Sequence, residues 1–505
     1  MAAHSARITP VIAAIGEQVD RPNLVEQARE PVDLMADALR ACEADAGVRL
    51  LEHVNLLNLV GLVSWPYKDP VSLLAQRLAI VPAEVVNASM GGETPVRLAH
   101  EAARRIALGE DIVAAIVGGE AVHARGQADK AGVRLPWTPQ ATKDEAFRFA
   151  SRVFAISPVA KQLGVMNPAQ VYPFYEVAAQ AAWGQTPAEG MRESAELWAR
   201  YAAVAADNPF AWIRSAPTAE AIGAASAENR LVNWPYPKLM NANPVVNQSA
   251  AAVVMSLARA REIGIAESRL VHVWGGASAL EPEDYLLRDR YDRSAAQAAV
   301  LEKAVSIAGG DAGRVRHLEL YSCFPIVPKM AMRTLGLDPA TCVPTVTGGL
   351  TFFGGPLNNY MTHAMAAMVR ALRREPHELG LLYGQGGYVN KHHALVLGVA
   401  PPPAPLASAY SVQDIADAMR GPVPPLHEDY VGPAIVETYT VRYARDGTAE
   451  DAIVIARTPD GGRTMAASPA SDKATIAMLT SPERTAVGLQ GRVAHDAMGQ
   501  RVWGH

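Results

Sequence analysis

The sequence feature that most constrains the fold is the stretch of residues 86–122, which predicts a loop, an amphipathic helix and a buried strand in direct succession. The pair Thr94-Pro95 suits a helix start, because proline needs no amide partner in the first turn and its fixed φ is already helical. Free amides at such a start attract a carbonyl oxygen or an anion. The apolar run 112–117 predicts a strand ending at Gly118-Gly119, where another segment or a ligand can come close.

Strands and helices alternate in the chain that precedes this stretch. Residues 8–16 and 54–63 predict strands, and residues 31–46 and 70–78 predict helices. Strands separated by helices favour a sheet with right-handed crossovers that is covered on both faces. Residues 86–122 complete this first half of the chain.

A second series of the same kind begins near residue 241. Residues 241–260 predict a polar turn, a strand and a helix, and residues 270–273 predict a further strand. The elements that follow are a helix at 293–307, a strand at 317–321, a helix at 328–335, a glycine-rich loop at 347–356, a helix at 359–373 and strands at 379–383 and 394–399. Identity between the halves is not visible by eye, so the repeat is inferred from element order and from the resemblance described below.

Large aromatic residues are concentrated between the two halves, in residues 121–240, where many prolines separate short helices. These aromatics are Trp137, Tyr172, Tyr175, Trp183, Trp198, Tyr201, Trp212 and Trp234. Aromatics on helices usually pack inward, so the pattern favours the core of an inserted helical subdomain over a dedicated recognition box.

A proline-rich linker and a change of pattern mark the C-terminal region. Residues 400–405, APPPAP, cannot continue a helix or a central strand. Beyond them, residues 435–443, 451–457 and 462–467 predict short strands separated by RDGT and PDGG turns. Short strands without a long helix predict a small β-barrel, which by itself implies no ligand.

Composition limits the classes of protein to consider. The chain has 505 residues, 50% of them hydrophobic, which is enough for two to four domains with sizeable cores. A net charge of -5 without a basic stripe argues against nucleic-acid binding. No signal peptide or run of about 18 apolar residues is visible. Three scattered cysteines argue against a disulfide framework or a metal site, so a reducing, cytoplasmic setting is expected.

Four glycine-containing motifs resemble the active-site loops of thiolases. VNASMGGE, with the later IVGGEAV, resembles the thiolase segment around the nucleophilic cysteine, and Met90 stands at the position of that cysteine. LELYSCF resembles the sterol-carrier branch of the family, with Tyr321 at the position of a water-orienting histidine. In TVTGGLTFFGGP, Gly355 replaces the catalytic histidine. In YGQGG, Gly384 replaces the proton-transferring cysteine.

The resemblance covers essentially the whole chain and is strongest to thiolase-like proteins of type 1. It implies a duplicated five-layer α/β/α/β/α thiolase fold with an inserted loop subdomain and a small C-terminal β-barrel of the oligonucleotide/oligosaccharide-binding (OB) type. The domains expected are an N-terminal thiolase half at 1–120 and 241–269, the inserted subdomain at 121–240, a C-terminal half at 270–400 and a β-rich domain at 406–505.

The resemblance also suggests which residues line an active site. The acid–base candidates are Tyr321 and His392, and the substrate-binding candidates are Met90, Gly91, Gly92, Gly355, Gly384 and Gly386. Tyr321 could equally be a packed core tyrosine. For Cys323 we favour packing over a relocated nucleophile. Adjacent strand residues point to opposite faces, so at most one of His392 and His393 would face a pocket, and a solvated or capping role is the commoner fate. His363 is expected to be an interior histidine.

The expected activity follows from these departures. Methionine cannot ionise or form an acyl thioester, so the ping-pong thiolase mechanism is not expected. By resemblance the chain is an acyltransferase of the acetyl-CoA acetyltransferase class that takes a coenzyme A thioester as substrate or ligand and holds no permanent cofactor. Two alternatives stay open, a thiolase-fold aldolase and a non-catalytic partner subunit. A monomer and a homodimer are both compatible with the sequence.

Overall fold

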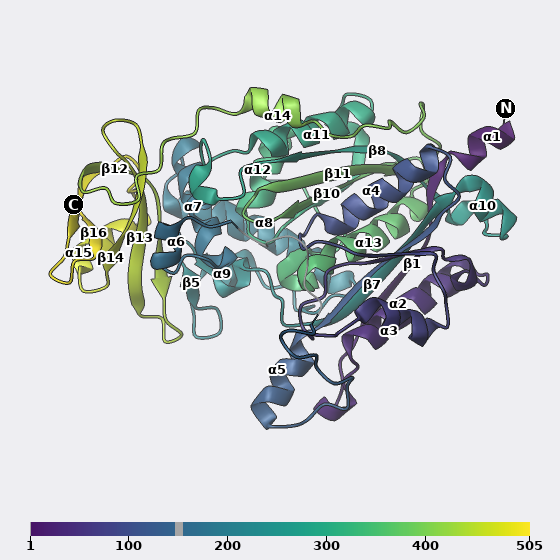
Figure 1. Ribbon diagram of the computed structural model, residues 1–505. Helices are drawn as coiled ribbons and strands as arrows, with labels where there is room; N and C mark the ends of the chain where they lie inside the picture. The colour runs from purple at the N-terminus through teal and green to yellow at the C-terminus, as the bar shows by residue number, and fades with distance from the viewer. Residues whose placement is uncertain (1, 147–154) are drawn as a thin grey trace.

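The computed structural model describes residues 2–146 and 155–505, and in this part of the chain the named strands form a nine-stranded and a seven-stranded sheet (Figure 1). The larger sheet runs in the order β3-β2-β4-β7-β1-β8-β11-β10-β9. Its first five strands are β1 (Pro10–Val19), β2 (Leu56–Leu59), β3 (Glu84–Asn87), β4 (Val113–Ala121) and β7 (Asn247–Ser256). β2 lies parallel to β3 and β4, whereas β7 lies antiparallel to β4 and β1.

The other four strands repeat this arrangement. They are β8 (Val271–Leu280), β9 (Val315–Leu320), β10 (Leu379–Gly386) and β11 (Lys391–Gly398). β10 is parallel to β9 and antiparallel to β11, just as β4 is parallel to β2 and antiparallel to β7. β11 is in turn antiparallel to β8, just as β7 is antiparallel to β1. The two halves meet where β1 pairs with β8 over Val11↔His272 and Ile12↔Val271. The duplication inferred from element order is therefore present in the strand topology.

Helices cover the two halves of this sheet and also separate them (Figure 1). The middle layer is α4 (Thr94–Ala107) and α13 (Tyr360–Arg374), each of which contacts strands of both halves. α13 is buried at nearly every position, as expected for a helix packed on both sides. The outer helices of the first half are α2 (Pro31–Ala46) and α3 (Pro70–Leu78), and those of the second are α11 (Ala295–Ile307) and α12 (Ile326–Thr334). The predicted five-layer thiolase fold is confirmed.

Between the halves, the chain forms a mainly helical insertion. Its elements are α5 (Val122–Ala131), α6 (Pro158–Gln162), α7 (Pro168–Ala182), α8 (Pro187–Asp207), α9 (Ala219–Gly223), β5 (Leu231–Asn233) and β6 (Tyr236–Pro237). Most of the aromatic residues that mark this region in the sequence are buried, including Trp198, Tyr172 and Tyr201. The expected packing role of these aromatics is confirmed.

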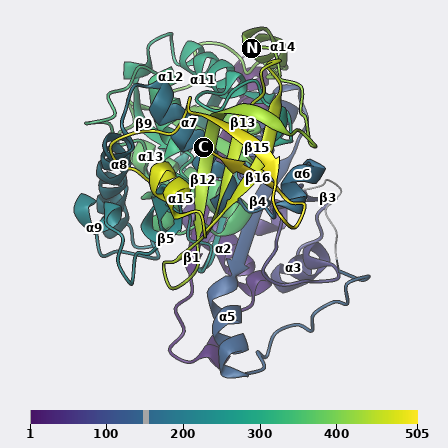
Figure 2. The ribbon, with the colours of Figure 1, turned by 90° about the vertical axis from the view of Figure 1, so that its left-hand side faces the viewer.

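A β-barrel forms one end of the molecule and faces the viewer in Figure 2. Its strands are β12 (Gly432–Tyr443), β13 (Ala449–Arg457), β14 (Arg463–Pro469), β15 (Gln490–His495) and β16 (Arg501–Gly504). The order β13-β14-β16-β15-β12 closes on itself because β12 also pairs with β13. The predicted small barrel is confirmed, although the sequence had indicated only its first three strands. β12 pairs with β5 as well, so the barrel sheet continues into the insertion.

The remaining α-helices are short. They are α1 (Ala2–Arg7), α10 (Leu257–Glu262), α14 (Gln413–Met419) and α15 (Lys473–Leu479). In the described part of the chain, no helix has both the length and the apolar character needed to cross a bilayer.

Candidate functional site

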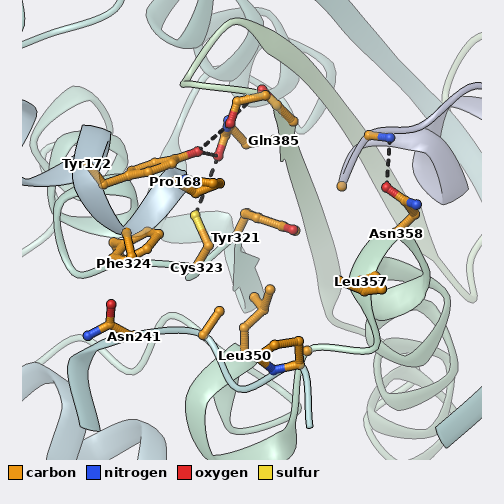
Figure 3. Close-up of a pocket in the computed structure, with 18 of the residues that line it drawn as sticks. Pro168, Tyr172, Asn241, Tyr321, Cys323, Phe324, Leu350, Leu357, Asn358 and Gln385 are labelled. Atoms are coloured by element: carbon orange, nitrogen blue, oxygen red, sulfur yellow. Dashed lines mark hydrogen bonds between the residues drawn. The ribbon is translucent and has the colours of Figure 1, made fainter. Parts of the chain in front are cut away.

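A cavity of about 460 Å³ lies where the glycine loops of the two halves meet the insertion (Figure 3). The loop before α4, the segment after β9, the loop before α13 and the end of β10 contribute to its wall, and α7 covers it. Six of the residues predicted from the sequence line the cavity together: Met90, Gly91, Gly92, Tyr321, Gly355 and Gly386. The structure thus brings together loops that are up to 296 residues apart in the chain, the distance from Met90 to Gly386.

Gly384 and His392 do not line this cavity. A Cβ atom added to Gly384 would lie 2.9 Å from the Cα atom of Glu93 and 3.4 Å from Val96, so that space is already filled from α4. A Cβ atom added to Gly355 would meet only Leu350, at an ordinary 3.4 Å. Of the two glycines that stand for thiolase catalytic residues here, only Gly355 therefore opens space toward the cavity.

Tyr321 follows the last residue of β9, and its amide donates to the carbonyl of Tyr383 at 3.0 Å. Its side chain is buried, but its hydroxyl makes no hydrogen bond within the described residues and lies against Gly92, where an added Cβ would overlap it. Burial, together with Cys323 and Glu93, raises the pKa of Tyr321 well above its ordinary value of 10.0. The phenol consequently stays protonated and can donate a hydrogen bond to a bound carbonyl.

The wall beside Tyr321 is a hydrogen-bonded group around Gln385 (Figure 3). The Tyr172 hydroxyl lies 2.9 Å from Gln385 Oε1, and the Cys323 sulfur lies 3.7 Å from the same oxygen. Burial raises the pKa of Cys323 to about 12, so its sulfur is a thiol at neutral pH rather than a nucleophilic thiolate. This supports the packing role expected for Cys323. The only sequence signal for Gln385 is its place between Gly384 and Gly386.

Backbone amides face the cavity at the start of α4. The Gly91 amide donates to Asn358 Oδ1 at 3.0 Å, and the Asn358 side chain in turn donates to the Gly61 carbonyl at 2.9 Å. The Gly92 amide makes no hydrogen bond to any described residue. It lies at the positive end of the helix dipole and can donate to a carbonyl oxygen or to an enolate oxygen.

One ionisable residue of this loop was not predicted. Glu93 immediately precedes α4 and is buried, but its side chain does not cap the helix. Burial raises the pKa of Glu93, while the positive charges of Lys391 and Arg97 act in the opposite direction. Lys391 donates to the Met90 carbonyl at 3.1 Å. An acidic residue directly after Gly91-Gly92 was the available sequence signal, but such residues at a helix start are usually caps.

His392 and His393 lie on opposite faces of β11, as the alternation of strand residues predicts. His393 faces α4 and lies 2.9 Å from the His100 ring, and His392 faces α11, where its Nδ1 lies 2.7 Å from the Tyr383 hydroxyl. Both are buried, so the solvated role that was one of the two expectations is wrong, whereas His392 Nε2 does lie 3.1 Å from the Val389 carbonyl oxygen. Burial lowers the pKa of His392 to about 4. Because His392 does not reach the cavity, we assign it no acid–base role.

His363 is an interior histidine, as expected. It lies on α13, is fully buried, and places Nδ1 2.6 Å from Glu17 Oε1. It takes no part in the wall of the cavity.

Comparison with known proteins agrees with the resemblance seen in the sequence. Residues 412–498 match the family described as the thiolase-like protein type 1 additional C-terminal domain. The whole chain is similar to the crystal structure of a monomeric SCP2-thiolase like protein type 1 from Mycobacterium smegmatis, with 28% identity, 99% of each chain covered and a TM-score of 0.83. The resemblance to thiolase-like proteins of type 1 is therefore confirmed.

Other similarities are more distant. The match to the structure of an Ltp2-ChsH2(DUF35) aldolase covers 78% of this chain and 98% of the aldolase chain, with a TM-score of 0.58. At 17% identity, this match shows a shared fold alone. The acetyl-CoA acetyltransferase of Schizosaccharomyces pombe is 26% identical over 141 residues, 28% of this chain. The chain spans about a third of the length of the curated relatives it matches.

Proposed function

We propose that the cavity binds an acyl-coenzyme A thioester and acts on it without forming a covalent acyl-enzyme. The observation that carries this proposal is the hydroxyl of Tyr321 beside the amide of Gly92, both without a hydrogen-bond partner in the described part of the chain, in an otherwise largely apolar cavity. Two hydrogen-bond donors placed together suit a carbonyl oxygen, and they stabilise it more as it gains negative charge. Coenzyme A is chosen because the curated relatives are acetyl-CoA acetyltransferases.

The absence of an acyl-enzyme follows from the side chains at hand. Met90 offers a thioether, which has no proton to lose, and the buried Cys323 stays protonated with a pKa of about 12. Intact-mass spectrometry after incubation with acetyl-CoA should therefore show the unmodified mass. An acetyl adduct on Cys323 would contradict this part of the proposal.

Among reactions that need no acyl-enzyme, we favour the making or breaking of a carbon–carbon bond next to the thioester carbonyl. Such aldol chemistry passes through an enolate, which the Tyr321 hydroxyl and the Gly92 amide are placed to stabilise. One protein of the same fold is described as an aldolase, although at 17% identity that likeness concerns fold alone. Acyl transfer by another route stays the second candidate, supported by the names of the curated relatives.

Calorimetry on the full chain tests the binding step. Acetyl-CoA, longer acyl-CoAs and free coenzyme A should give saturable heats. Gly355→Trp should abolish them, because Gly355 lines the cavity with space in front of it. Gly126→Trp is the matched control, since Gly126 lies in α5 with nothing within 4 Å of its added Cβ. Failure of every thioester to bind the wild type at millimolar concentration would remove the proposal and favour a partner subunit.

The oligomeric state belongs to the same proposal. We infer a monomer, because the similar protein from Mycobacterium smegmatis is described as monomeric. Light scattering on the full chain would give the mass of a single 53.7 kDa chain, and a mass twice as large would contradict it.

A further inference from the structure

The side chain of Glu93 occupies a niche made by three glycines of this site. A Cβ atom on Gly91 or on Gly386 would overlap the Glu93 carboxyl group, and a Cβ on Gly384 would crowd the Glu93 Cα atom at 2.9 Å. Gly384 and Gly386 lie on β10, far from Glu93 in the sequence. Gly91 and Gly386 thus make room for the carboxyl group, and Gly384 makes room for the Cα and Cβ atoms of the same residue.

Among the described residues, that carboxyl group has no hydrogen-bond partner beyond the backbone amide of Glu93 itself. Neither of its oxygens accepts a hydrogen bond from another described residue, and Oε2 is wholly buried. The nearest ammonium group, that of Lys391, donates to the Met90 carbonyl instead. Leaving a buried carboxyl group unpaired costs free energy, so its retention at a cavity wall calls for a functional explanation.

The carboxyl group also lies next to the cavity rather than deep in the core. Gly91 and Gly386, the two glycines it touches, both line the cavity. No Cβ atom stands between the carboxyl group and the ligand space at these positions. Glu93 itself is not a lining residue, so its carboxyl group lies one backbone layer behind the wall, and a small shift of the Gly91 or Gly386 backbone would bring a bound ligand into the range over which a general base acts.

We infer that Glu93 is the proton-transferring residue of this cavity and exchanges a proton with the carbon atom next to the thioester carbonyl of a bound acyl-CoA. This inference rests on the proposed binding of acyl-CoA. In the step, the carbon–hydrogen bond breaks, the proton joins the Glu93 carboxylate, and the electron pair forms an enolate. The enolate oxygen accepts hydrogen bonds from Tyr321 and Gly92, and return of the proton restores the thioester.

The charged and titratable groups around Glu93 fit this role. Burial raises the pKa of Glu93, while Lys391, its own backbone amide and Arg97 act in the opposite direction, and a raised pKa makes its carboxylate a stronger base than that of an exposed glutamate. Tyr321 stays protonated beside it and acts as a donor, not as a competing base. The two groups therefore divide the work between proton transfer and enolate stabilisation.

Deuterium exchange tests the inference without knowledge of the physiological reaction. Wild-type protein is incubated with acetyl-CoA in D₂O, and deuterium in the acetyl methyl group is followed by mass spectrometry. Glu93→Gln, which keeps the shape of the side chain, should slow the catalysed exchange by about 100-fold or more, the usual scale for a lost acid–base group. Its affinity for acetyl-CoA should change by less than about 10-fold, the scale of one hydrogen bond.

A control and the alternative outcomes complete the design. Glu101→Gln, in helix α4 and paired with Arg97 away from the niche, should exchange at the wild-type rate. The melting temperature of Glu93→Gln should be at or above that of the wild type, because a neutral amide costs less to bury than a carboxyl group that can ionise. Binding of acetyl-CoA without exchange in the wild type, or unchanged exchange in Glu93→Gln, overturns this inference alone. No calorimetric binding overturns the proposed function and this inference with it.

Discussion

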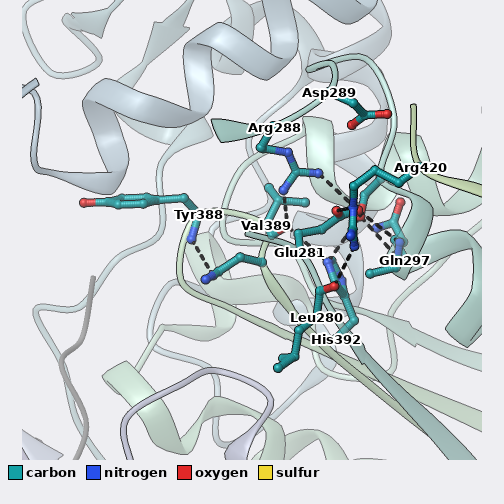
Figure 4. A network of polar contacts seen from close by, with 12 residues as sticks. Leu280, Glu281, Arg288, Asp289, Gln297, Tyr388, Val389, His392 and Arg420 are labelled. Carbon is teal, nitrogen blue, oxygen red and sulfur yellow. Dashed lines mark hydrogen bonds and ion pairs between the residues drawn. The ribbon is translucent and has the colours of Figure 1, made fainter. Parts of the chain in front are cut away.

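Two regions of the molecule use buried polar groups in opposite ways: the cavity, and a polar network made by Glu281, Arg288, Ser294 and Arg420 (Figures 3 and 4). At the cavity, the Tyr321 hydroxyl and the Gly92 amide have no partner within the described residues, and the Glu93 carboxyl group has none outside its own residue. In the network, Glu281 accepts from the Ser294 hydroxyl at 2.7 Å and from Arg420 Nε at 2.8 Å. Unmet polar groups beside a cavity indicate a ligand, whereas a buried carboxylate that is paired with two guanidinium groups indicates a structural role, even though Arg288 Nε and Nη2 make no hydrogen bond to a described residue.

The network joins segments from several parts of the fold. Arg288 is fully buried, with its Nη2 atom 3.5 Å from Glu281 Oε1, and it donates to the Val389 carbonyl at 2.6 Å. Arg420, in the segment that leads to the barrel, forms a second ion pair with Glu281. Burial alone would raise the pKa of Glu281, but Arg288, the Ala296 amide and the Ser294 hydroxyl lower it to about 2. Its carboxylate is thus charged and paired, unlike that of Glu93.

The largest effect expected from this contrast is on stability. Glu281→Ala leaves Arg288 and Arg420 without their buried counter-charge, which typically costs about 3–5 kcal/mol. We expect a large drop in the denaturant midpoint and, in the folded protein, acyl-CoA affinity close to that of the wild type. A stable variant that no longer binds would show that the two regions are coupled, contrary to our comparison.

The pH dependence of stability should also belong to the network. His392 has a folded pKa of about 4, below the ordinary 6.5, because burial disfavours its charged form. The unfolded chain therefore binds more protons between these values, and stability is lost as pH falls from about 6.5 toward 4, by up to roughly 3 kcal/mol for this group. Thermal melts from pH 7.5 to 4.5 should show a shallower fall for His392→Gln than for the wild type.

Glu281, Arg288 and the Val389 carbonyl face His392, and the expected slope requires that these groups stay in place. Tyr321→Phe should keep the wild-type slope, since it removes nothing from the network. Equal slopes for His392→Gln and the wild type would assign the acid sensitivity to other buried histidines, such as His100 and His393.

Tyr321→Phe should act on catalysis rather than on stability. Loss of a positioned donor to an enolate oxygen is expected to slow α-proton exchange by about 100-fold, equivalent to about 2.7 kcal/mol. The melting temperature should hardly change, because the hydroxyl has no partner to lose. His392→Ala should behave in the opposite way, with reduced stability and an unchanged exchange rate. Slower exchange in His392→Ala together with reduced stability in Tyr321→Phe would contradict our assignment.

The smallest effect separates two glycines of the same cavity. Gly92→Ala would overlap the Tyr321 hydroxyl and the Gln385 carbonyl, whereas Gly355→Ala meets only Leu350 at 3.4 Å. We expect the first substitution to weaken acyl-CoA binding by about 10-fold, or about 1.4 kcal/mol, and the second by less than half of that energy. Calorimetry measures both, and equal losses would mean that the donor position at Gly92 is unimportant.

Local signals made much of the fold predictable. α2 and α3 begin and end at the predicted residues because Pro31 and Pro70 occupy first-turn positions and left-handed residues, Gly47 and Ala79, follow their ends. β15 and β16 escaped notice because they are short and their exposed positions are polar. The predicted glycine-rich loop contains a single π-helical turn, Gly349–Phe353, which no sequence period announces.

The site was predictable only in part, for a physical reason. Glycine motifs mark where backbone must come close, and six such predictions meet at one cavity. His392 was predicted to face the cavity, and it does not. Alternation along a strand predicts that neighbouring side chains lie on opposite faces, but it does not predict which elements cover each face. Glu93 was missed because its niche depends on Gly384 and Gly386, which only the folded chain brings beside it.

A crystal structure with a bound acyl-CoA would test the central claim most directly. The account predicts the thioester carbonyl oxygen within about 3 Å of the Tyr321 hydroxyl and the Gly92 amide, with the adjacent carbon atom facing Glu93 and no bond to any sulfur. A thioester bound outside the cavity, or an acyl group attached to Cys323, would contradict it.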